Sequence, residues 1–223
     1  YDEIKNTTRK KPKNRLKIMD KNRTFDINDI TSPESLEDAV DHFLGEIETQ
    51  DYFIKETHQY TLCLSENFYS PYDKWIRVGW ALKNTHESLF ITWIAFSAQS
   101  DNFDFDKIPD FYEMWCRFDK CNDAGLTFRS IMYWAKNDNL AKYKEVREET
   151  IDYFVDITIE TPTDFDFALV LYHMYKDDFV CVSIKKDIWF IYMNHRWEEN
   201  EGGTDLRMSI SRELFQIYFK RML

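Results

Sequence analysis

Glycine and proline are scarce in this chain of 223 residues, with five of each. Architectures built mainly from β-strands need many tight turns, and those turns draw heavily on glycine and proline. The sequence also lacks any apolar run near the roughly 18 residues that a membrane-spanning helix requires. These two absences disfavour an all-β fold and a membrane protein.

Motifs that bind nucleotides or carry out hydrolysis are missing as well. The chain has no G-x-x-x-x-G-K-[ST] loop for phosphates, no G-x-S-x-G nucleophile motif and no H-E-x-x-H zinc motif. The adjacent glycines Gly202 and Gly203 follow an acidic segment that would repel phosphate. We therefore expect no catalytic residue in this chain.

Cysteine is limited to four residues, and no signal peptide is recognisable. We expect free thiols in a reducing compartment inside the cell, and a protein that is not secreted. Cys116 and Cys121 have a spacing loosely compatible with half of a zinc site, but zinc needs about four ligands and a second pair is missing. Packed thiols are the favoured interpretation, and no metal site is predicted.

Acidic side chains offer one further candidate for chemistry. On a strand, Asp104 and Asp106 would share a face and hold Mg²⁺. At a helix start, the same acids would favour the positive end of the helix dipole. We prefer the second interpretation, and we extend it to Asp164 and Asp166.

Two histidines are the remaining candidates for acid–base chemistry. His173 stands among apolar residues of a helical pattern, so we expect it in the core or at its boundary. His195 has acidic neighbours, but no serine or cysteine nucleophile stands beside it. We expect His195 to form a hydrogen bond within a turn while Trp197 packs beneath it. We do not expect His195 to act as a general base.

Charge is distributed unevenly along the chain. The formal net charge is −11, yet residues 1–23 carry nine Lys or Arg against three acidic residues, which leaves −17 for residues 24–223. A basic arm on an acidic body can contact phosphates locally even when the whole molecule is negative. The alternative is a solvated linker, and the sequence favours neither interpretation.

Apolar residues at helical spacing predict a first block of short helices that is rich in aromatic residues, which make up 17% of the chain. The expected helices cover residues 33–56, 70–84, 88–100, 109–118, 127–138 and 141–149. Segment 88–100 is almost entirely apolar, so we expect it at the centre of the core. The other face of segment 33–56 is acidic, and we expect that face to be solvated.

The pattern changes after Thr161. A helix is expected next, and β-branched and aromatic residues on both sides of Lys185, Lys186 and Asp187 then predict a β-hairpin. Residues 205–222 have the periodicity of an amphipathic helix. The chain is thus expected to be mainly α, or α+β overall, with a helical bundle followed by a small module of helix, β-hairpin and helix.

Basic side chains alternate with aromatic residues in several segments, a pattern suited to phosphate contact and base stacking. We name seven candidate nucleic-acid contacts: Arg77, Lys83, Arg129, Lys136, Lys185, Lys186 and Arg196. The alternative is that the aromatic residues form the core, which we favour for the tryptophans. Six residues are accordingly expected to have structural roles: Trp75, Gly79, Trp80, Trp134, His195 and Trp197.

Three segments in order resemble the type 2 primase C-terminal domain: FYSPYDKWIRVGWALKNT, LFITWIAFSAQSDNFD and GLTFRSIMYWAKNDN. The first matches at Tyr72, Trp75, Val78, Gly79, Ala81, Leu82, Lys83 and Asn84. The other two match at Trp93, Phe96, Ser97, Gly125, Leu126, Thr127, Ser130, Ile131, Trp134, Ala135 and Lys136. Three matched segments in order are far more specific than any one of them.

The last part of the chain is similar to the N-terminal part of the helicase half of poxvirus-like primase-helicases from large DNA viruses. It matches at Trp189, Tyr192, His195, Arg196, Trp197, Gly202 and Gly203. Together with the charge distribution, the two resemblances predict three parts: a basic arm or linker over 1–30, a helical primase C-terminal-like domain over 31–150, and the start of a collar-like helicase domain over 151–223.

This resemblance implies a place between an archaeo-eukaryotic-type primase and a superfamily 3 helicase in viral DNA replication. We expect the chain to be part of a longer primase-helicase, whose NTPase activity, ATP and Mg²⁺ belong to other segments. No cofactor is expected here. The expected partners are DNA, the primase and helicase domains of the same protein, and further copies in a hexamer formed through the helicase. We expect no membrane contact, and a location in the host cytoplasm or a viral replication factory.

Three functions are compatible with these patterns. The favoured one is a non-catalytic connector that contacts single-stranded or forked DNA. The second is a purely structural module for oligomerisation or partner recruitment, without DNA binding. The third, with the least support, is a metal-dependent nuclease that uses Asp104 and Asp106. The acidic segment 33–56 has no assigned role.

Overall fold

The computed structural model of the chain describes residues 26–118, 125–160 and 162–222. Helices dominate these residues and accompany one small antiparallel sheet, which confirms the predicted mainly α fold with a small β module. No helix of the described part is long and apolar enough to cross a membrane. The basic arm 1–23 and Cys121 lie outside the described residues. The chain divides into two compact units, Tyr1–Tyr143 and Lys144–Leu223, each described by itself below.

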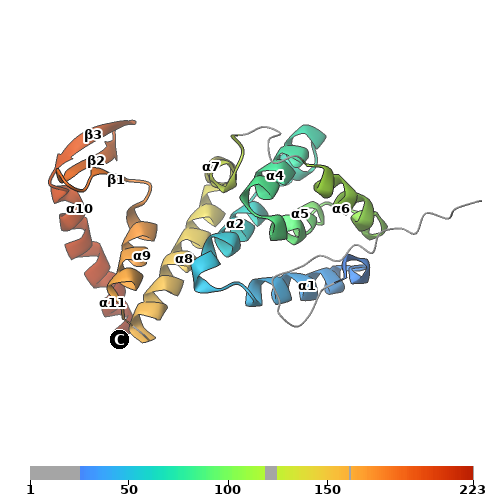
Figure 1. Cartoon of the computed structure of the whole chain (residues 1–223), viewed down its shortest axis with the longest axis horizontal. Coiled ribbons are helices and arrows are strands. Elements are labelled where there is room, and N and C mark those ends of the chain that lie inside the picture. Colours follow the sequence, from blue (N-terminus) through green and yellow to red (C-terminus); the bar gives the residue numbers. More distant parts are fainter. Residues whose placement is uncertain (1–25, 119–124, 161, 223) are drawn as a thin grey trace, which may run out of the picture. The chain divides into compact units, whose positions relative to one another are not determined.

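The first unit is built from short helices around an aromatic core (Figure 1). Its helices are α1 (Pro33–Gly45), α2 (Tyr52–Leu62), α3 (Glu66–Tyr69), α4 (Tyr72–Thr85), α5 (Phe90–Ser97), α6 (Ile108–Arg117) and α7 (Phe128–Asp138), and α8 (Leu140–Glu160) begins in it. Within this unit, α2 and α5 lie between α1 on one side and α4 with α7 on the other (Figure 1).

Helix α5 is the centre of that core, as its apolar sequence predicts. Phe90, Trp93 and Phe96 are completely buried. The Trp93 ring stacks on the Trp75 ring of α4 at 4.6 Å and lies 5.8 Å from the Trp115 ring of α6. A helix that is apolar on every side is stable only when other helices cover it, and α1, α2, α4 and α6 all contact α5.

The prediction of one helix over 33–56 is wrong, because two helices occupy this segment. Helix α1 begins at the predicted place, where Ser32 and Ser35 form a reciprocal cap and Pro33 takes the first position. It ends at Gly45, where glycine offers little helix stabilisation. A short 3₁₀ turn (Thr49–Asp51) then leads into α2. The acids on the outer face of α1 are exposed, as expected.

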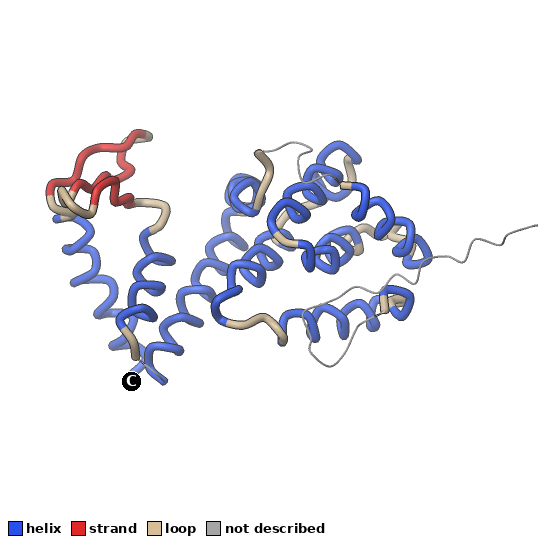
Figure 2. Tube along the Cα trace, viewed as in Figure 1, coloured by secondary structure: helices blue, strands red, loops and turns tan. Residues whose placement is uncertain are grey.

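The second unit combines three helical segments with a small sheet (Figure 2). After α8 come α9 (Asp164–Tyr175), the strands β1 (Phe179–Ser183), β2 (Ile188–Met193) and β3 (Arg196–Glu201), and then α10 (Thr204–Ser209). A π-helical turn (Ile210–Leu214) connects α10 to α11 (Phe215–Met222). Arg221 ties α11 to α8, because its guanidinium lies 2.8 Å from carboxylate oxygens of both Asp152 and Asp156.

The predicted hairpin has a third strand. The segment RWEENE, which has the composition of an acidic turn, pairs along its whole length with β2, and the strand order is β1-β2-β3. Glutamate is a poor strand former, so the local sequence does not favour this state. The pairing of Trp197 with Tyr192, whose rings lie 5.3 Å apart, stabilises it across the strands.

Gly79 is the tightest position between α4 and α5. A Cβ atom there would lie 2.9 Å from the Trp93 ring and 3.1 Å from the Phe118 ring. We expect Gly79→Ala to lower the free energy of unfolding by about 1–3 kcal/mol, because neither ring can move away within this packed core.

Chemical denaturation followed by tryptophan fluorescence measures this change. Gly45→Ala is the matched control, because a Cβ atom at Gly45 meets nothing within 4 Å. Equal stability of the two variants would contradict the packing assigned to Gly79.

Candidate nucleic-acid interface

Three of the predicted contact residues, Arg77, Arg129 and Lys136, are exposed on the neighbouring helices α4 and α7 of the first unit. We call the surface around them the α4–α7 face and define it by Phe68, Lys74, Arg77, Arg129, Tyr133, Trp134 and Lys136. The four cations and Tyr133 are exposed, whereas Phe68 and Trp134 are half-buried. The face combines positive charge with aromatic rings, which is the chemistry expected of a nucleic-acid surface.

Hydrogen bonds fix α7 at both ends against the rest of the unit. At its start, the backbone N–H of Phe128 donates to the Thr85 hydroxyl at 2.7 Å, and the Asn84 amide donates to the Leu126 carbonyl at 3.0 Å. At its end, Asp138 accepts from the backbone N–H of Ser65 at 2.7 Å and from the Ser65 hydroxyl at 3.0 Å. The side chains of α7 are therefore held at a fixed place beside α4.

Two cations of α4 stand over aromatic rings. The Arg77 guanidinium carbon lies 5.6 Å from the centre of the Trp134 ring, and the Lys74 ammonium lies 5.1 Å from the centre of the Phe68 ring. The Phe68 and Trp134 rings themselves are 5.8 Å apart. A cation over a ring face is attracted by the ring quadrupole, and this attraction keeps both long side chains on the surface of the rings.

Tyr133 is the most exposed ring of the face, with 67% of its surface accessible. Arg129 lies four residues before it and Lys136 three residues after it, so all three project from one side of α7, while Trp134 projects from the neighbouring side, toward Arg77 of α4. Sequence reasoning missed Tyr133, Phe68 and Lys74. The spacing of Arg129, Tyr133 and Lys136 along a helix is the signal that could have identified Tyr133.

Lys83 differs from the other predicted contacts because it is buried, with 7% of its side chain exposed. Its ammonium lies 2.5 Å from the Glu87 carboxylate and 5.2 Å from the centre of the Trp115 ring. A charge that is already paired and covered has little to offer a phosphate. Lys83 thus contributes to the core, and the α4–α7 face does not include it.

The three predicted contacts of the second unit do not form one patch. Lys185 and Lys186 are exposed in the turn between β1 and β2, whereas Arg196 follows the turn between β2 and β3, at the other end of the sheet. Arg196 forms an ion pair with Glu198 at 2.8 Å. Their roles in DNA contact stay predictions.

The residues expected to be structural differ in burial. Trp75 donates its indole N–H to Ser97 at 2.8 Å, and Trp80 packs edge-on against Phe118. His195 is exposed in the turn after β2, with a left-handed backbone (φ 64°), and Trp197 is 47% exposed. The expected packing of Trp197 beneath a histidine is replaced by its contact with Tyr192.

The acids and the other histidine occupy the structural positions favoured by the sequence. Asp104 accepts from the backbone N–H of Asp106 at 3.1 Å and caps a 3₁₀ turn, while Asp164 and Asp166 lie in the first turn of α9. His173 is buried and stacks on Phe154 at 4.5 Å. Among the described residues, no three His, Cys, Asp or Glu side chains are grouped as a metal site needs.

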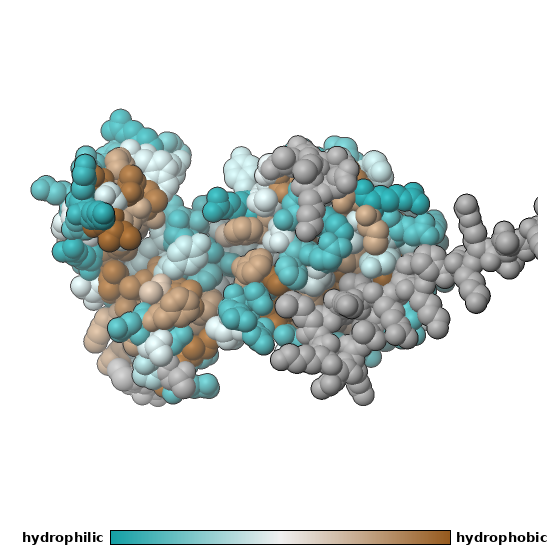
Figure 3. All heavy atoms as spheres, viewed as in Figure 1, coloured by the Kyte–Doolittle hydropathy of each residue, from teal (hydrophilic) through white to brown (hydrophobic). Residues whose placement is uncertain are grey.

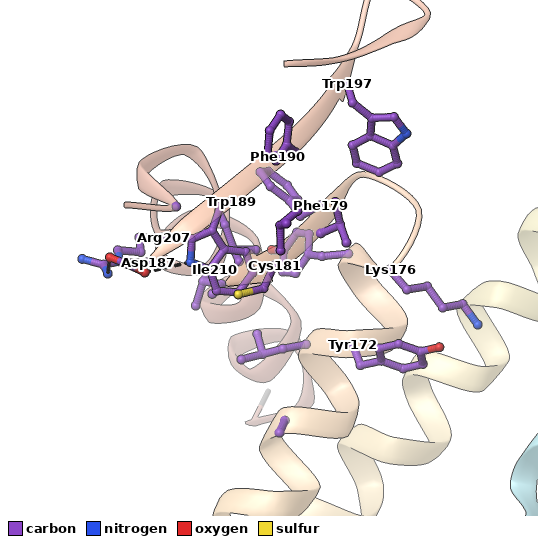
Figure 4. A pocket seen from close by; sticks show the side chains of 17 residues that line it. Tyr172, Lys176, Phe179, Cys181, Asp187, Trp189, Phe190, Trp197, Arg207 and Ile210 are labelled. Atoms are coloured by element: carbon purple, nitrogen blue, oxygen red, sulfur yellow. Dashed lines mark hydrogen bonds and ion pairs between the residues drawn. The ribbon is translucent and has the colours of Figure 1, made fainter. Parts of the chain in front are cut away.

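An apolar groove of about 1110 Å³ lies in the second unit (Figure 4). It lies between α9, the sheet and α10, and Tyr172, Phe179, Trp189 and Trp197 contribute rings to its wall. Polar groups are confined to its margin, where Arg207 pairs with Asp187 at 3.4 Å. Hydrophobic atoms reach the surface over this unit (Figure 3). The groove holds no cluster of groups suited to catalysis.

Residues 57–135 match the family model of the primase C-terminal domain described as Primase C terminal 2 (PriCT-2). This span contains the whole α4–α7 face except Lys136, which follows it directly. The resemblance of the first unit to type 2 primase C-terminal domains is thereby confirmed.

Two proteins of large DNA viruses are similar over most of the chain. One, from Acanthamoeba polyphaga mimivirus, is named "Putative helicase L207/L206" and is 30% identical over 177 residues, which cover 76% of this chain and 18% of that protein. The other, from Frog virus 3, is named "Putative helicase 022R" and is 26% identical over 171 residues, which cover 74% of this chain and 16% of that protein. The chain thus spans less than a fifth of either relative. These similarities confirm the resemblance to the middle region of a viral primase-helicase.

His58 of α2 gives the first unit a pH-dependent stability. The ring is buried, its Nδ1 lies 2.9 Å from the Thr92 hydroxyl, and burial lowers the pKa of His58 to about 4. Above about pH 6.5 the ring is neutral in both states. Between there and pH 4, only the unfolded chain binds the proton, so the free energy of unfolding falls as the pH falls, by about 3 kcal/mol in all.

We expect His58→Gln to make the free energy of unfolding less dependent on pH between pH 6.5 and pH 4. Its slope against pH should decrease by the amount that corresponds to about one bound proton. Urea unfolding at a series of pH values measures it. His195→Asn, which changes an exposed histidine in a turn, is the control and should keep the wild-type slope. A His58→Gln slope equal to that of wild type would exclude this source of pH dependence.

Proposed function

We propose that this chain is a non-catalytic connector within a viral DNA-replication primase-helicase, and that it contacts DNA. The observation that carries the proposal is that one chain combines two kinds of match. A primase C-terminal domain occupies residues 57–135, and similarity to helicase-named proteins about five times longer extends over three quarters of the chain. Under this proposal, a module with both likenesses joins the two activities and needs no active site of its own.

The connection between the two units supports this proposal. Their boundary at Tyr143 and Lys144 falls inside α8, so a helix of 21 residues runs through it in place of a Gly- or Pro-rich linker. A continuous helix transmits orientation along its axis, whereas a flexible linker only limits distance. Under this proposal, ATP and Mg²⁺ are bound by other segments, hexamer formation belongs to the helicase part, and the protein works in the host cytoplasm or a viral replication factory.

Breaking α8 in the whole protein tests the connector. We expect Lys144→Gly with Glu145→Pro to leave primer synthesis and ATP hydrolysis near wild type when each is assayed alone. Primer synthesis coupled to unwinding of a forked template should fall by about tenfold, because proline and glycine interrupt the helix.

Lys144→Ala with Glu145→Ala is the matched control. It removes the same two exposed side chains and keeps the helix, so coupled activity should remain. Full coupled activity in the Gly–Pro variant, or a whole protein without primer synthesis, would overturn the proposal.

A structural module that associates with a second copy of this chain is the other candidate function. It is favoured by the outer edge of β1, which pairs with no further strand among the described residues. Val180 and Val182 of this strand are 42% and 63% exposed, and Ile184 in the turn that follows is 90% exposed. The turn after this edge carries Lys185 and Lys186, while the opposite edge, β3, exposes Glu199 and Glu201. The two edges are complementary in charge, so head-to-tail pairing of copies is the association they favour.

Sedimentation of the chain over a range of concentrations tests this second candidate. We expect Val182→Lys to raise the dissociation constant of the self-associated form at least tenfold, because it places a charge in the apolar edge. Val40→Lys on α1 of the other unit is the control. A chain that remains monomeric at every concentration would exclude this function.

A further inference from the structure

We propose that the α4–α7 face binds single-stranded nucleic acid, with bases stacked on its rings and phosphates held by its cations. The proposed function makes DNA the expected polymer, and the inference rests on that function for this choice only. The new assignments are Tyr133 and the Arg77–Trp134 pair as the stacking surface, and Lys74, which rests on Phe68, as a fourth cation beside Arg77, Arg129 and Lys136.

The four cations are free to meet an anion. Among the described residues, none of the four lies within 4 Å of a carboxylate oxygen, although Lys83, Arg117, Arg147 and Arg207 all do. The positions of two of them are nevertheless restrained, because Arg77 and Lys74 rest on aromatic rings. A cation that is already held in place loses little conformational entropy when it binds a phosphate. Binding is therefore more favourable than it would be for a mobile side chain.

Carboxylates that would repel a phosphate are concentrated elsewhere in the unit. Helix α1 carries Glu34, Glu37, Asp38 and Asp41, and it lies on the other side of α2 and α5 from α4 and α7 (Figure 1). Near the face, Asp138 is engaged by two hydrogen bonds from Ser65, whereas Asp73, next to Lys74 in α4, and Glu66 of α3 are exposed. Charges separated by more than about 8–10 Å are largely screened in physiological salt. The negative net charge of the chain therefore does not determine the electrostatic potential at this face.

The rings decide between single strands and duplex. A base exposes its flat face for stacking only when it is unpaired, and stacking on aromatic side chains tolerates every sequence. Tyr133 projects into solvent between two cations at the spacing of one helical turn. A duplex would meet the same cations through its phosphates but would leave Tyr133 and the Arg77–Trp134 pair without a base to stack on.

Fluorescence anisotropy of the full chain with a labelled 20-nucleotide single strand of DNA measures the binding. The same sequence is also offered as duplex DNA and as single-stranded RNA. We expect the single strand to bind more tightly than the duplex. Tyr133→Ala should weaken binding about tenfold through lost stacking, and Arg77→Glu should weaken it at least tenfold and reduce the salt dependence.

Matched controls separate this face from general charge and exposure. Tyr172→Ala removes a ring that is also largely exposed, and Arg117→Glu reverses a cation of α6 that is paired with Glu113. Both should bind like wild type. Circular dichroism and thermal unfolding check that each variant is folded, and Tyr133 is exposed enough that its removal should not disturb the core.

Removal of residues 1–23 distinguishes the face from the basic arm. Binding that persists in the shortened chain and still depends on Tyr133 supports the inference. Binding that disappears with the arm, equal affinity for duplex and single strand, or a Tyr133→Ala variant with wild-type affinity would each overturn it. Complete absence of nucleic-acid binding would do the same and leave a protein partner as the occupant.

The outcomes also separate this inference from the proposed function. Preference for RNA with dependence on Tyr133 would support the stacking site and contradict the role in DNA replication. If instead the Gly–Pro variant of α8 keeps full coupled activity while DNA binding still depends on Tyr133, that result rejects the connector function and retains the binding site.

Discussion

The contact between α4 and α5 at Gly79 is the constraint on which the first unit depends. Because glycine has no side chain, the Trp93 ring lies against the backbone of α4, and the Trp75 ring stacks on it from the same helix. This packing fixes which side of α4 faces inward. The outward side then presents Lys74 and Arg77, and hydrogen bonds from Asn84 and to Thr85 place α7 next to them. The surface chemistry is thus a consequence of how the core is packed.

Charge separation within a small unit makes an acidic protein compatible with an anionic partner. The carboxylates of α1 and the cations of α4 and α7 occupy opposite sides of the helices α2 and α5. Screening by salt lets the two surfaces act independently over this separation. Acidic surroundings would also weaken unspecific adsorption to duplex phosphates, so the rings of the α4–α7 face can contribute to discrimination.

The second unit has a different surface, with an apolar groove, a free strand edge and scattered cations. Its sheet is small, and the pairing of an acidic strand with an aromatic one completes it. The two units therefore offer different contacts to different partners, and helix α8 runs from one into the other. This combination agrees with a module whose role is to hold other parts of a protein in place.

Local sequence determined several features of this protein: the cap of α1 at Ser32, the buried helix α5, the capping role of Asp104, and the motif-bearing segments of a primase C-terminal domain. These features depend on residues close together in the chain or on the spacing of apolar residues. Both can be read from one sequence. Tertiary structure alone decided the others. The strand β3 forms against local propensity because β2 pairs with it, Lys83 is buried because Glu87 and Trp115 lie above it, and Arg77 meets Trp134 because α7 returns to α4. The Arg77–Trp134 and Lys83–Trp115 contacts join residues far apart in the chain, and β3 depends on its pairing with β2. Spacing along the sequence does not encode this packing.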